Sequence, residues 1–365
     1  MKSVEKKLRI LFLKLILFFI KNKSTSFEAK SFDRILIIRQ HDQLGDFLIS
    51  TPTIRAVRKK FPKSYISVVV SQYLEPMILN NPNVDEIIVY REKLSRWNFK
   101  WFINFIKNLR RDGGYDLAIV LNTISRSITS DLIALLSNAK NILSSDNHLL
   151  TGFKTEPVYT ILSHRDEKEK TEIQRNLDIV KAIDVKSNGF DYDLFLTNEE
   201  ILEGKNILKK LNLHRYKKIV GVHFGTLDVT RRFPLDKLAE VIDLIISKYN
   251  VTVLNIIGKN EIALQDEFLK LVKHKIYLAP LVPIRISASI MQNLSLFLCN
   301  DTGPLHIASA LNIPTVSFHS TNDPKIWKPP HSRHIAVRTK DKLINSITVR
   351  DAMNQIHKAM TNYVN

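Results

Sequence analysis

The sequence predicts an α/β protein built from two doubly wound domains of similar size. Three observations support this fold class. The chain has 365 residues, which is long enough to bury two separate cores. From residue 33 onward, short β-rich runs alternate with helical patterns, as they do in parallel sheets with crossover helices. After a polar stretch between residues 185 and 200, the same alternation begins again.

The predicted elements follow this division. In the first domain, residues 31–190, we expect strands at residues 34–38, 65–70, 86–90 and 116–120, with helical segments between them. In the second domain, residues 191–340, we expect them at 218–224, 251–258, 294–299 and 314–318. A final helical pattern, from Ile344 to Met360, lies in a C-terminal segment, residues 341–365, which could return to the first domain.

Residues 1–30 are predicted to form a basic, apolar helix that associates with a membrane surface. The stretch from Leu8 to Ile20 is apolar apart from Arg9 and Lys14, and lysines flank it. It is shorter than the roughly 20 residues that span a bilayer, and no convincing signal-peptide cleavage site follows it. A helix lying in the interface of an anionic membrane therefore fits, and a helix packed on the protein itself is the alternative.

The charge balance predicts an anionic partner. Lys and Arg number 54 against 36 Asp and Glu, a formal net charge of +18. Such an excess suits nucleic acid, an acidic membrane surface or a phosphorylated substrate. No nucleic-acid-binding motif is present, so nucleic acid is not expected as a partner. The single cysteine, Cys299, excludes an internal disulfide; because it lies in an apolar run, we expect it to be buried, in a reducing cytoplasmic protein.

Glycine placement indicates where a ligand binds. Five of the ten glycines, namely Gly45, Gly221, Gly225, Gly258 and Gly303, fall at or just after predicted strands. In open α/β sheets this edge carries the ligand site. Neither a G-x-G-x-x-G fingerprint nor a Walker loop occurs, so a dinucleotide site and a P-loop are unsupported.

The first motif is IRQHDQLGDFLISTPTIRAVRKKFP, residues 38–62, in which Gly45 and Asp46 follow a strand and a polar loop. A carboxylate held there could deprotonate an attacking hydroxyl. Asp46 could equally cap a helix, and the spacing leaves the two roles open. Thr51 and Pro52 predict the start of another helix, with proline at its first position.

Two further motifs suit a phosphorylated ligand. In VGVHFGTLDVTRRFPLDKLAEVI, residues 220–242, a hydroxyl and two arginines follow a strand; the alternative is a surface loop with exposed arginines. In NDTGPLHIAS, residues 300–309, an acid, a hydroxyl, a glycine and a histidine lie between a strand and a helix. Together they suit a nucleotide diphosphate, although a lone histidine there is more often a packed residue.

These motifs, with NPNVDEIIVY and DPKIW in the same order, resemble glycosyltransferase family 9, which includes the ADP-heptose:lipopolysaccharide heptosyltransferases. The resemblance covers roughly residues 33–335. It implies the GT-B fold, two Rossmann-like domains with a cleft between them, and an inverting, metal-independent single displacement. The chain departs from the family at His319, where a glycine is usual, and in a longer loop between Arg39 and Asp46. Asp191 and Asp193 resemble a metal-binding motif of another glycosyltransferase fold but lie in the expected linker.

The resemblance also implies roles for individual residues. Asp46 would be the general base. The donor would contact Thr226, Arg231, Arg232, Glu261, Asp301, Thr302, Gly303 and His306. Gly45, His41 and Arg39 would be acceptor-side candidates.

We therefore expect a cytoplasmic enzyme, peripheral on the inner face of the membrane, that moves a sugar from a nucleotide-diphosphate donor to a lipid-linked saccharide. By the resemblance the donor is ADP-heptose, the acceptor is the lipopolysaccharide core, and no cofactor is required. Two alternatives remain: a nucleotide-sugar epimerase of GT-B-like fold, and a non-enzymatic protein that binds anionic ligands.

Overall fold

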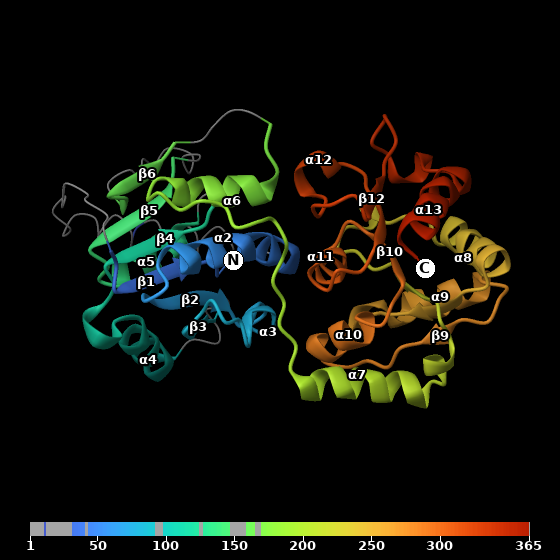
Figure 1. Ribbon diagram of the computed structural model, residues 1–365, viewed down its shortest axis with the longest axis horizontal. Helices are drawn as coiled ribbons and strands as arrows, with labels where there is room; N and C mark the ends of the chain where they lie inside the picture. The colour runs from blue at the N-terminus through green and yellow to red at the C-terminus, as the bar shows by residue number, and fades with distance from the viewer. Residues whose placement is uncertain are drawn as a thin grey trace. The chain divides into compact units, whose positions relative to one another are not determined.

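The structure is a computed structural model that describes residue 11 and residues 31–40, 43–91, 98–123, 127–146, 158–164 and 169–364. The chain divides into two compact units, Met1–Phe190 and Asp191–Asn365 (Figure 1). The predicted membrane-associating helix, residues 1–30, lies outside the described residues except for Leu11. Among the helices that are described, none is long and apolar enough to span a bilayer.

The first unit is built on a six-stranded parallel sheet with the strand order β3-β2-β1-β4-β5-β6. Its strands are β1 Arg34–Ile38, β2 Tyr65–Ser71, β3 Glu86–Tyr90, β4 Leu117–Val120, β5 Asn141–Ser145 and β6 Ile161–Ser163. Its helices are α2 Leu44–Lys60, α3 Glu75–Ile78, α4 Phe99–Leu109, α5 Ile128–Leu136 and α6 Glu172–Lys181.

Both faces of this sheet are covered. In β1, Leu36 and Ile38 lie in a buried apolar cluster with side chains of α4 and α5. Ile35 and Ile37 are also buried and, by the alternation of a strand, point to the opposite face. Helices α2 and α6 pack against each other and are absent from the α4–α5 cluster, which places them on that second face. A strand that is buried on both faces is nearly continuous in apolar residues, which explains Ile35–Ile38 of the RILII run.

The second unit repeats the design with the strand order β12-β11-β10-β7-β8-β9, again parallel throughout. Its strands are β7 Ile219–His223, β8 Thr252–Asn255, β9 Tyr277–Leu278, β10 Leu296–Asn300, β11 Thr315–Phe318 and β12 His334–Val337. Its helices are α7 Asn198–Lys210, α8 Leu235–Tyr249, α9 Ile262–Leu271, α10 Ile284–Met291, α11 Gly303–Ala310, α12 Pro324–Trp327 and α13 Val349–Tyr363.

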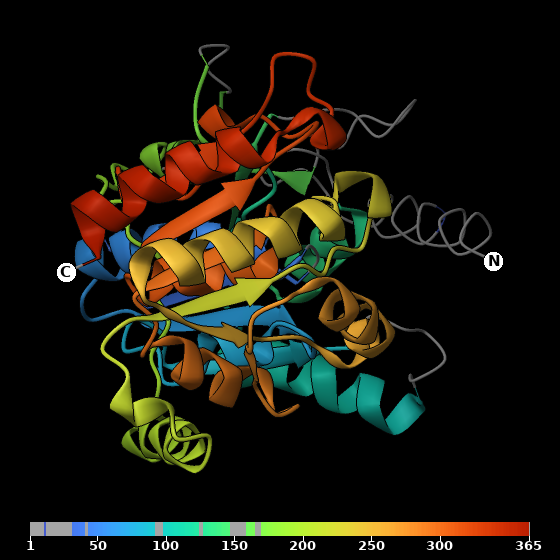
Figure 2. The same cartoon turned by 90° about the vertical axis from the view of Figure 1, so that its right-hand side faces the viewer.

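The last helix, α13, packs beside α8 on one face of the second sheet (Figure 2). Its buried residues Ala352, Ile356 and Ala359 belong to the core of the second unit. The helix begins at Val349 rather than at Ile344, because Thr348 and Asp351 form a reciprocal capping box at its start.

The prediction of a helix start at Thr51 and Pro52 is wrong, since α2 continues through Pro52. Proline lacks the N–H that would bond to the carbonyl of the residue four positions earlier, here Leu48. The Thr51 hydroxyl donates to that carbonyl at 2.7 Å, so the acceptor remains satisfied. The neighbouring Ser50 hydroxyl donates to the carbonyl of Phe47 at 2.6 Å.

Four strands were not predicted from the sequence: β5, β6, β9 and β12. Each lies at or next to an edge of its sheet, and each has only two to five residues. The run NILSS of β5 has only two apolar residues, Ile142 and Leu143, and its pairing with β4 and β6 identifies it as a strand. Cys299 is buried in β10, as expected.

Candidate functional site

In the second unit, the connections diverge between β7 and β10: the chain leaves β7 toward β8 on one side and returns to place β10 on the other. Ligands of open α/β sheets bind at the carboxyl ends of the strands at this position. Asn300, at the end of β10, ties the two strand ends together. Its side-chain oxygen accepts from the amide of Phe233 and its nitrogen donates to the carbonyl of Phe224, both at 2.9 Å.

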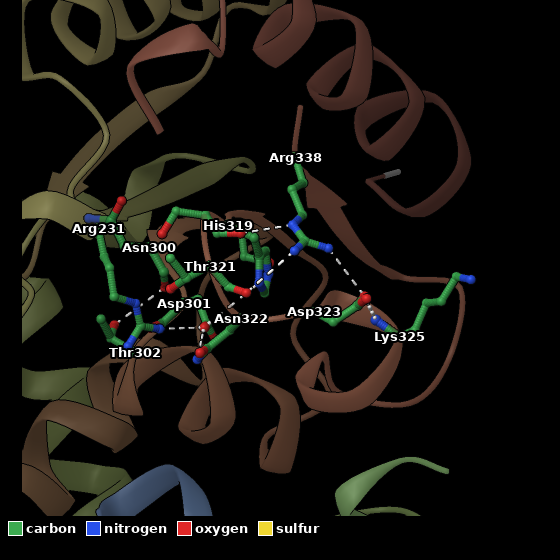
Figure 3. Close-up of polar contacts among 12 residues, drawn as sticks. Arg231, Asn300, Asp301, Thr302, His319, Thr321, Asn322, Asp323, Lys325 and Arg338 are labelled. Atoms are coloured by element: carbon green, nitrogen blue, oxygen red, sulfur yellow. Dashed lines mark hydrogen bonds and ion pairs between the residues drawn. The ribbon is translucent and has the colours of Figure 1, made fainter. Parts of the chain in front are cut away.

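Arg231 and Asp301 meet at this position although they are far apart in the sequence (Figure 3). The guanidinium Nη2 lies 2.6 Å from the Asp301 carboxylate and 3.2 Å from its backbone carbonyl. The Asn322 amide donates to the same carboxylate oxygen at 2.8 Å. Asp301 is nearly buried, whereas 29% of the Arg231 side chain is exposed. The arginine is therefore oriented from one side while it still presents N–H groups to a ligand.

Thr226 and Glu261 flank the end of β7. The Thr226 hydroxyl donates to the backbone carbonyl of Asp228, which closes the turn before Arg231. The Glu261 carboxylate accepts from the amide of Gly258 at 2.5 Å. It also lies against Gly225: a Cβ at that position would be 2.1 Å from the carboxylate Oε1. Only glycine at position 225 permits this approach.

We expect Gly225→Ala to displace the Glu261 carboxylate and to weaken donor binding by roughly tenfold, the effect of losing one hydrogen bond. The fold should tolerate the change, because the clashing atoms belong to the end of a mobile glutamate side chain. Isothermal titration with the nucleotide donor measures the first effect and urea denaturation the second. Glu261→Gln is the matched variant; if it and Gly225→Ala both bind donor normally, Glu261 has no donor contact.

The start of α11 brings Thr302, Gly303 and His306 to the same sheet edge. Thr302 is the N-cap in extended conformation, and its hydroxyl donates to the carbonyl of Asn300 at 3.3 Å. His306 is only 5% exposed and lies beside the ring of Tyr192. Burial lowers the pKa of His306 to about 4, so the imidazole is neutral at pH 7. Its Nδ1 has no hydrogen-bond partner among the described residues.

Two groups at this edge were not among the predicted site residues. His319 follows β11, is fully buried and places Nδ1 3.8 Å from the Asp301 carboxylate. Arg338 follows β12, donates to the carbonyl of Ser320 at 2.8 Å and lies 3.4 Å from the carboxylate of Asp323 (Figure 3). The histidine at position 319, where the family usually has glycine, was a sequence signal for His319. Arg338 could not be predicted because the strand before it, β12, was not predicted.

Arg232, the other predicted donor residue of the RRFP motif, is half-buried, and its Nε has no partner in the described part of the chain. Asp191 of the DYD segment is engaged by His331, whose Nε2 lies 2.6 Å from its carboxylate.

The buried histidines make stability depend on pH. Burial lowers the pKa of His306 and His319 to about 4 and that of His334 to about 3. In the unfolded chain these groups titrate near 6.5, so below that pH the unfolded state binds more protons. We therefore expect the free energy of unfolding to fall by several kcal/mol as the pH drops from about 6.5 to about 4.

Urea denaturation at a series of pH values measures this decrease. The variant His334→Gln, which has no imidazole to titrate, should show a shallower decrease. A free energy of unfolding that stays constant between pH 7 and pH 5 would contradict the prediction. Carboxylates do not explain a decrease between pH 7 and pH 5, since they titrate mainly below pH 5.

In the first unit, the connections diverge between β1 and β4, and α2 begins beside these strand ends. Asp46 is the third residue of α2, half-buried, and its carboxylate accepts from the amide of Gln43 at 3.2 Å. The capping role is therefore present. Gly45 is buried beside it in the first turn.

Of the other acceptor-side candidates, Arg39 is buried and His41 lies outside the described residues. The Arg39 guanidinium donates to the carbonyl of Leu121 and, at 3.2 Å, to the carbonyl of Asp46. It thus joins β1, β4 and α2. In this position the Arg39 guanidinium orients the first turn of α2.

Sequence analysis missed two polar residues at this edge. Gln40 donates to the hydroxyls of Ser127 and Ser130 at the start of α5, at 3.3 and 3.2 Å. Asn122 follows β4 and is 3% exposed, and neither polar atom of its side chain has a partner among the described residues. A buried amide without partners is costly, so Asn122 is a candidate to bind a ligand near Asp46.

Comparisons with known proteins identify the family of the chain. The model of glycosyltransferase family 9 (heptosyltransferase) matches residues 102–357. A putative glycosyltransferase of Haemophilus influenzae is 26% identical over 321 residues, covering 83% of this chain and 88% of that protein.

Two solved structures show the same fold. The glycosyltransferase family 9 protein of Veillonella parvula superimposes with a TM-score of 0.80 at 18% identity, covering 93% of this chain and 99% of that one. The E. coli ADP-heptose lps heptosyltransferase II superimposes with a TM-score of 0.72 at 17% identity, covering 90% and 98%. The fold is therefore GT-B, with two Rossmann-like domains. The chain is a glycosyltransferase enzyme and belongs to glycosyltransferase family 9, the heptosyltransferase family.

Proposed function

We propose that this enzyme transfers heptose from ADP-heptose to a lipid-linked saccharide, such as the lipopolysaccharide core, with inversion at the anomeric carbon. The observation that carries the proposal is the group formed by Arg231, Asp301 and Asn322 at the carboxyl edge of the second sheet. It suits a nucleotide diphosphate, since an oriented guanidinium grips phosphate oxygens in pairs. The E. coli relative named above acts with ADP-heptose, which supports this donor.

The second domain holds the donor in this proposal. Arg231 and the free amides at the start of α11 lie where they can contact the diphosphate. Glu261 is placed to accept from a ribose hydroxyl, because its carboxylate lies over Gly225 at the end of β7. When the bond between the anomeric carbon and the diphosphate breaks, Arg231 stabilises the negative charge that ADP carries away.

The first domain activates the acceptor. Asp46 takes the proton from an acceptor hydroxyl, and the hydroxyl oxygen attacks the anomeric carbon of the donor. One new glycosidic bond forms as the bond to the diphosphate breaks, and the single displacement inverts the configuration. Asn122, buried and without partners among the described residues, can hold the acceptor through its free amide. We place the enzyme on the inner face of the cytoplasmic membrane, where a lipid-linked acceptor is available.

A panel of nucleotide diphosphates and nucleotide sugars in a thermal-shift assay tests the donor. A ligand that binds only the folded state raises the melting temperature by mass action. We expect a rise with ADP and with ADP-heptose, and little with UDP or GDP. Incubation with ADP-heptose and isolated lipopolysaccharide core should then give a heptosylated product with inverted anomeric configuration. A UDP-selective shift would contradict the proposed donor and indicate another sugar.

A further inference from the structure

One face of helix α4 packs against the core of the first unit. Phe105 and Leu109 are buried in the core of the first unit. The ring of Trp101 stacks on Phe105 with centroids 5.3 Å apart, and Tyr90 packs edge-on against Phe105. Trp101, Phe105 and Leu109 are four residues apart and therefore lie on the same, inward face of α4.

The outward face of α4 combines apolar and basic side chains. Phe99 is 81% exposed, which is unusual for a phenylalanine. Ile103, one turn later, is only half-buried, and Lys107 follows another turn on. Lys100 and Lys107 are exposed, and no hydrogen bond or ion pair joins either of them to the described part of the chain. An aromatic ring next to free lysines on one helical face is typical of helices that lie in a membrane interface.

The charged residues of the α4 segment itself are all basic. From Asn98 to Arg111 the sequence NFKWFINFIKNLRR contains four basic residues and no acidic one. The two arginines are engaged within the fold: Arg110 donates to the carbonyl of Leu136 at 2.7 Å, and Arg111 lies 3.1 Å from the carboxylate of Glu86. The two lysines therefore remain for an external anion.

The position of α4 connects this face with the acceptor edge. Strand β3 ends at Tyr90 on the carboxyl edge of the sheet, and α4 packs against β3 as it runs back (Figure 1). The N-terminal end of α4, which carries Phe99, therefore lies toward the same edge of the first sheet as the start of α2 with Asp46.

We propose that the outward face of α4 docks the first domain on an anionic phospholipid bilayer. Phe99 enters the headgroup region, and Lys100 and Lys107 lie at the lipid phosphates. This inference rests on the proposed function in one respect, because a lipid-linked acceptor gives the enzyme a reason to approach the membrane. Because the N-terminal end of α4 lies toward the carboxyl edge of the sheet, docking through α4 keeps that edge of the acceptor domain near the bilayer. It is distinct from the expected association of residues 1–30.

Sedimentation of the full chain with vesicles tests the docking. We expect binding to vesicles of phosphatidylcholine with phosphatidylglycerol and weak binding to phosphatidylcholine alone. The triple variant Phe99→Ser, Lys100→Glu and Lys107→Glu should lower the partition coefficient by roughly tenfold or more, since each basic residue at such a surface contributes about fivefold. The matched control changes Leu202→Ser, Lys205→Glu and Lys209→Glu, three exposed residues of α7, and should bind like the parent.

Because residues 1–30 are also expected to bind membrane, a local probe is needed. The chain has three tryptophans, at positions 97, 101 and 327. In a background with all three changed to Phe, Phe99→Trp should show blue-shifted emission and quenching by brominated lipid when vesicles are added. Leu202→Trp in the same background should show neither. Absence of quenching at position 99, with vesicle binding intact, would overturn the proposal.

The same variants separate this inference from the proposed function. With a soluble, delipidated acceptor, the α4 triple variant should transfer sugar at the parental rate, because none of its changes touches the donor or Asp46. If the parent itself fails to transfer sugar to that acceptor, the proposed function fails and the vesicle results remain valid. If the protein binds duplex DNA as strongly as vesicles, the face binds nucleic acid instead of the bilayer. If light scattering shows a dimer for the parent and a monomer for the triple variant, the face binds a second copy of the chain.

Discussion

Asp46→Asn is expected to lower kcat by roughly 10²–10⁴-fold while donor affinity stays unchanged. The amide cannot accept the proton of an acceptor hydroxyl. It can still accept the hydrogen bond from the amide of Gln43, which Asp46 accepts at 3.2 Å, so the start of α2 should be preserved. The measurements are the steady-state transfer rate at saturating donor and the affinity for ADP by isothermal titration.

A capping role alone would give a different result. In that case Asp46→Asn would change the melting temperature slightly and leave turnover as it is. Asp351→Asn is the matched control, because Asp351 occupies the same third position in α13 and accepts from the amide of Thr348 at 3.1 Å. We expect this control to affect stability only. Unchanged turnover in Asp46→Asn would remove Asp46 from the role of general base.

Arg231→Ala is expected to weaken donor binding by roughly 10–100-fold, because charge-assisted hydrogen bonds to phosphate contribute about 1.5–3 kcal/mol. The variant should also lose stability, since it leaves the nearly buried carboxylate of Asp301 with Asn322 as its remaining side-chain hydrogen-bond donor. Arg231→Lys keeps the positive charge and should recover much of the affinity. Isothermal titration with the donor and urea denaturation measure the two effects separately.

The control for this variant is a second, partly buried ion pair in the same unit. Arg285 donates to the carboxylate of Glu200 at 2.5 and 2.7 Å and to the carbonyl of Phe195 at 2.6 Å. Arg285→Ala should destabilise the protein as well, yet leave the affinity of the remaining folded protein for the donor unchanged. If Arg231→Ala and Arg285→Ala have the same effect on donor affinity, Arg231 has only a structural role.

Much of the fold could be predicted from the sequence because the central strands are buried on both faces. Runs such as RILII and LSLFLC are almost wholly apolar, as expected of strands that are buried on both faces. The missed strands lie toward the edges. The run NILSS of β5 is paired with β4 on one side and with the three-residue β6 on the other, so its conformation depends on its neighbours rather than on its own apolar content.

The candidate site was likewise predicted only in part from the sequence. The motifs QLGD and DTGPLH pointed to Asp46, Asp301 and His306, because each motif lies where a recognisable strand is followed by a helix. The structure adds contacts between segments that are distant in sequence. Arg231 reaches Asp301 across 70 positions, and Asn322 and His319 approach the same carboxylate from the loop after β11.

By itself, the sequence determined the α/β class and the central strands, and it indicated the residue types proposed to meet a phosphorylated ligand, since these follow from local composition and spacing. Only the tertiary structure decided which polar groups pair with one another. Parallel strands that are far apart in the chain end at one sheet edge, and the partners of Asp301 and the burial of Arg39 and His306 depend on which strands become neighbours there.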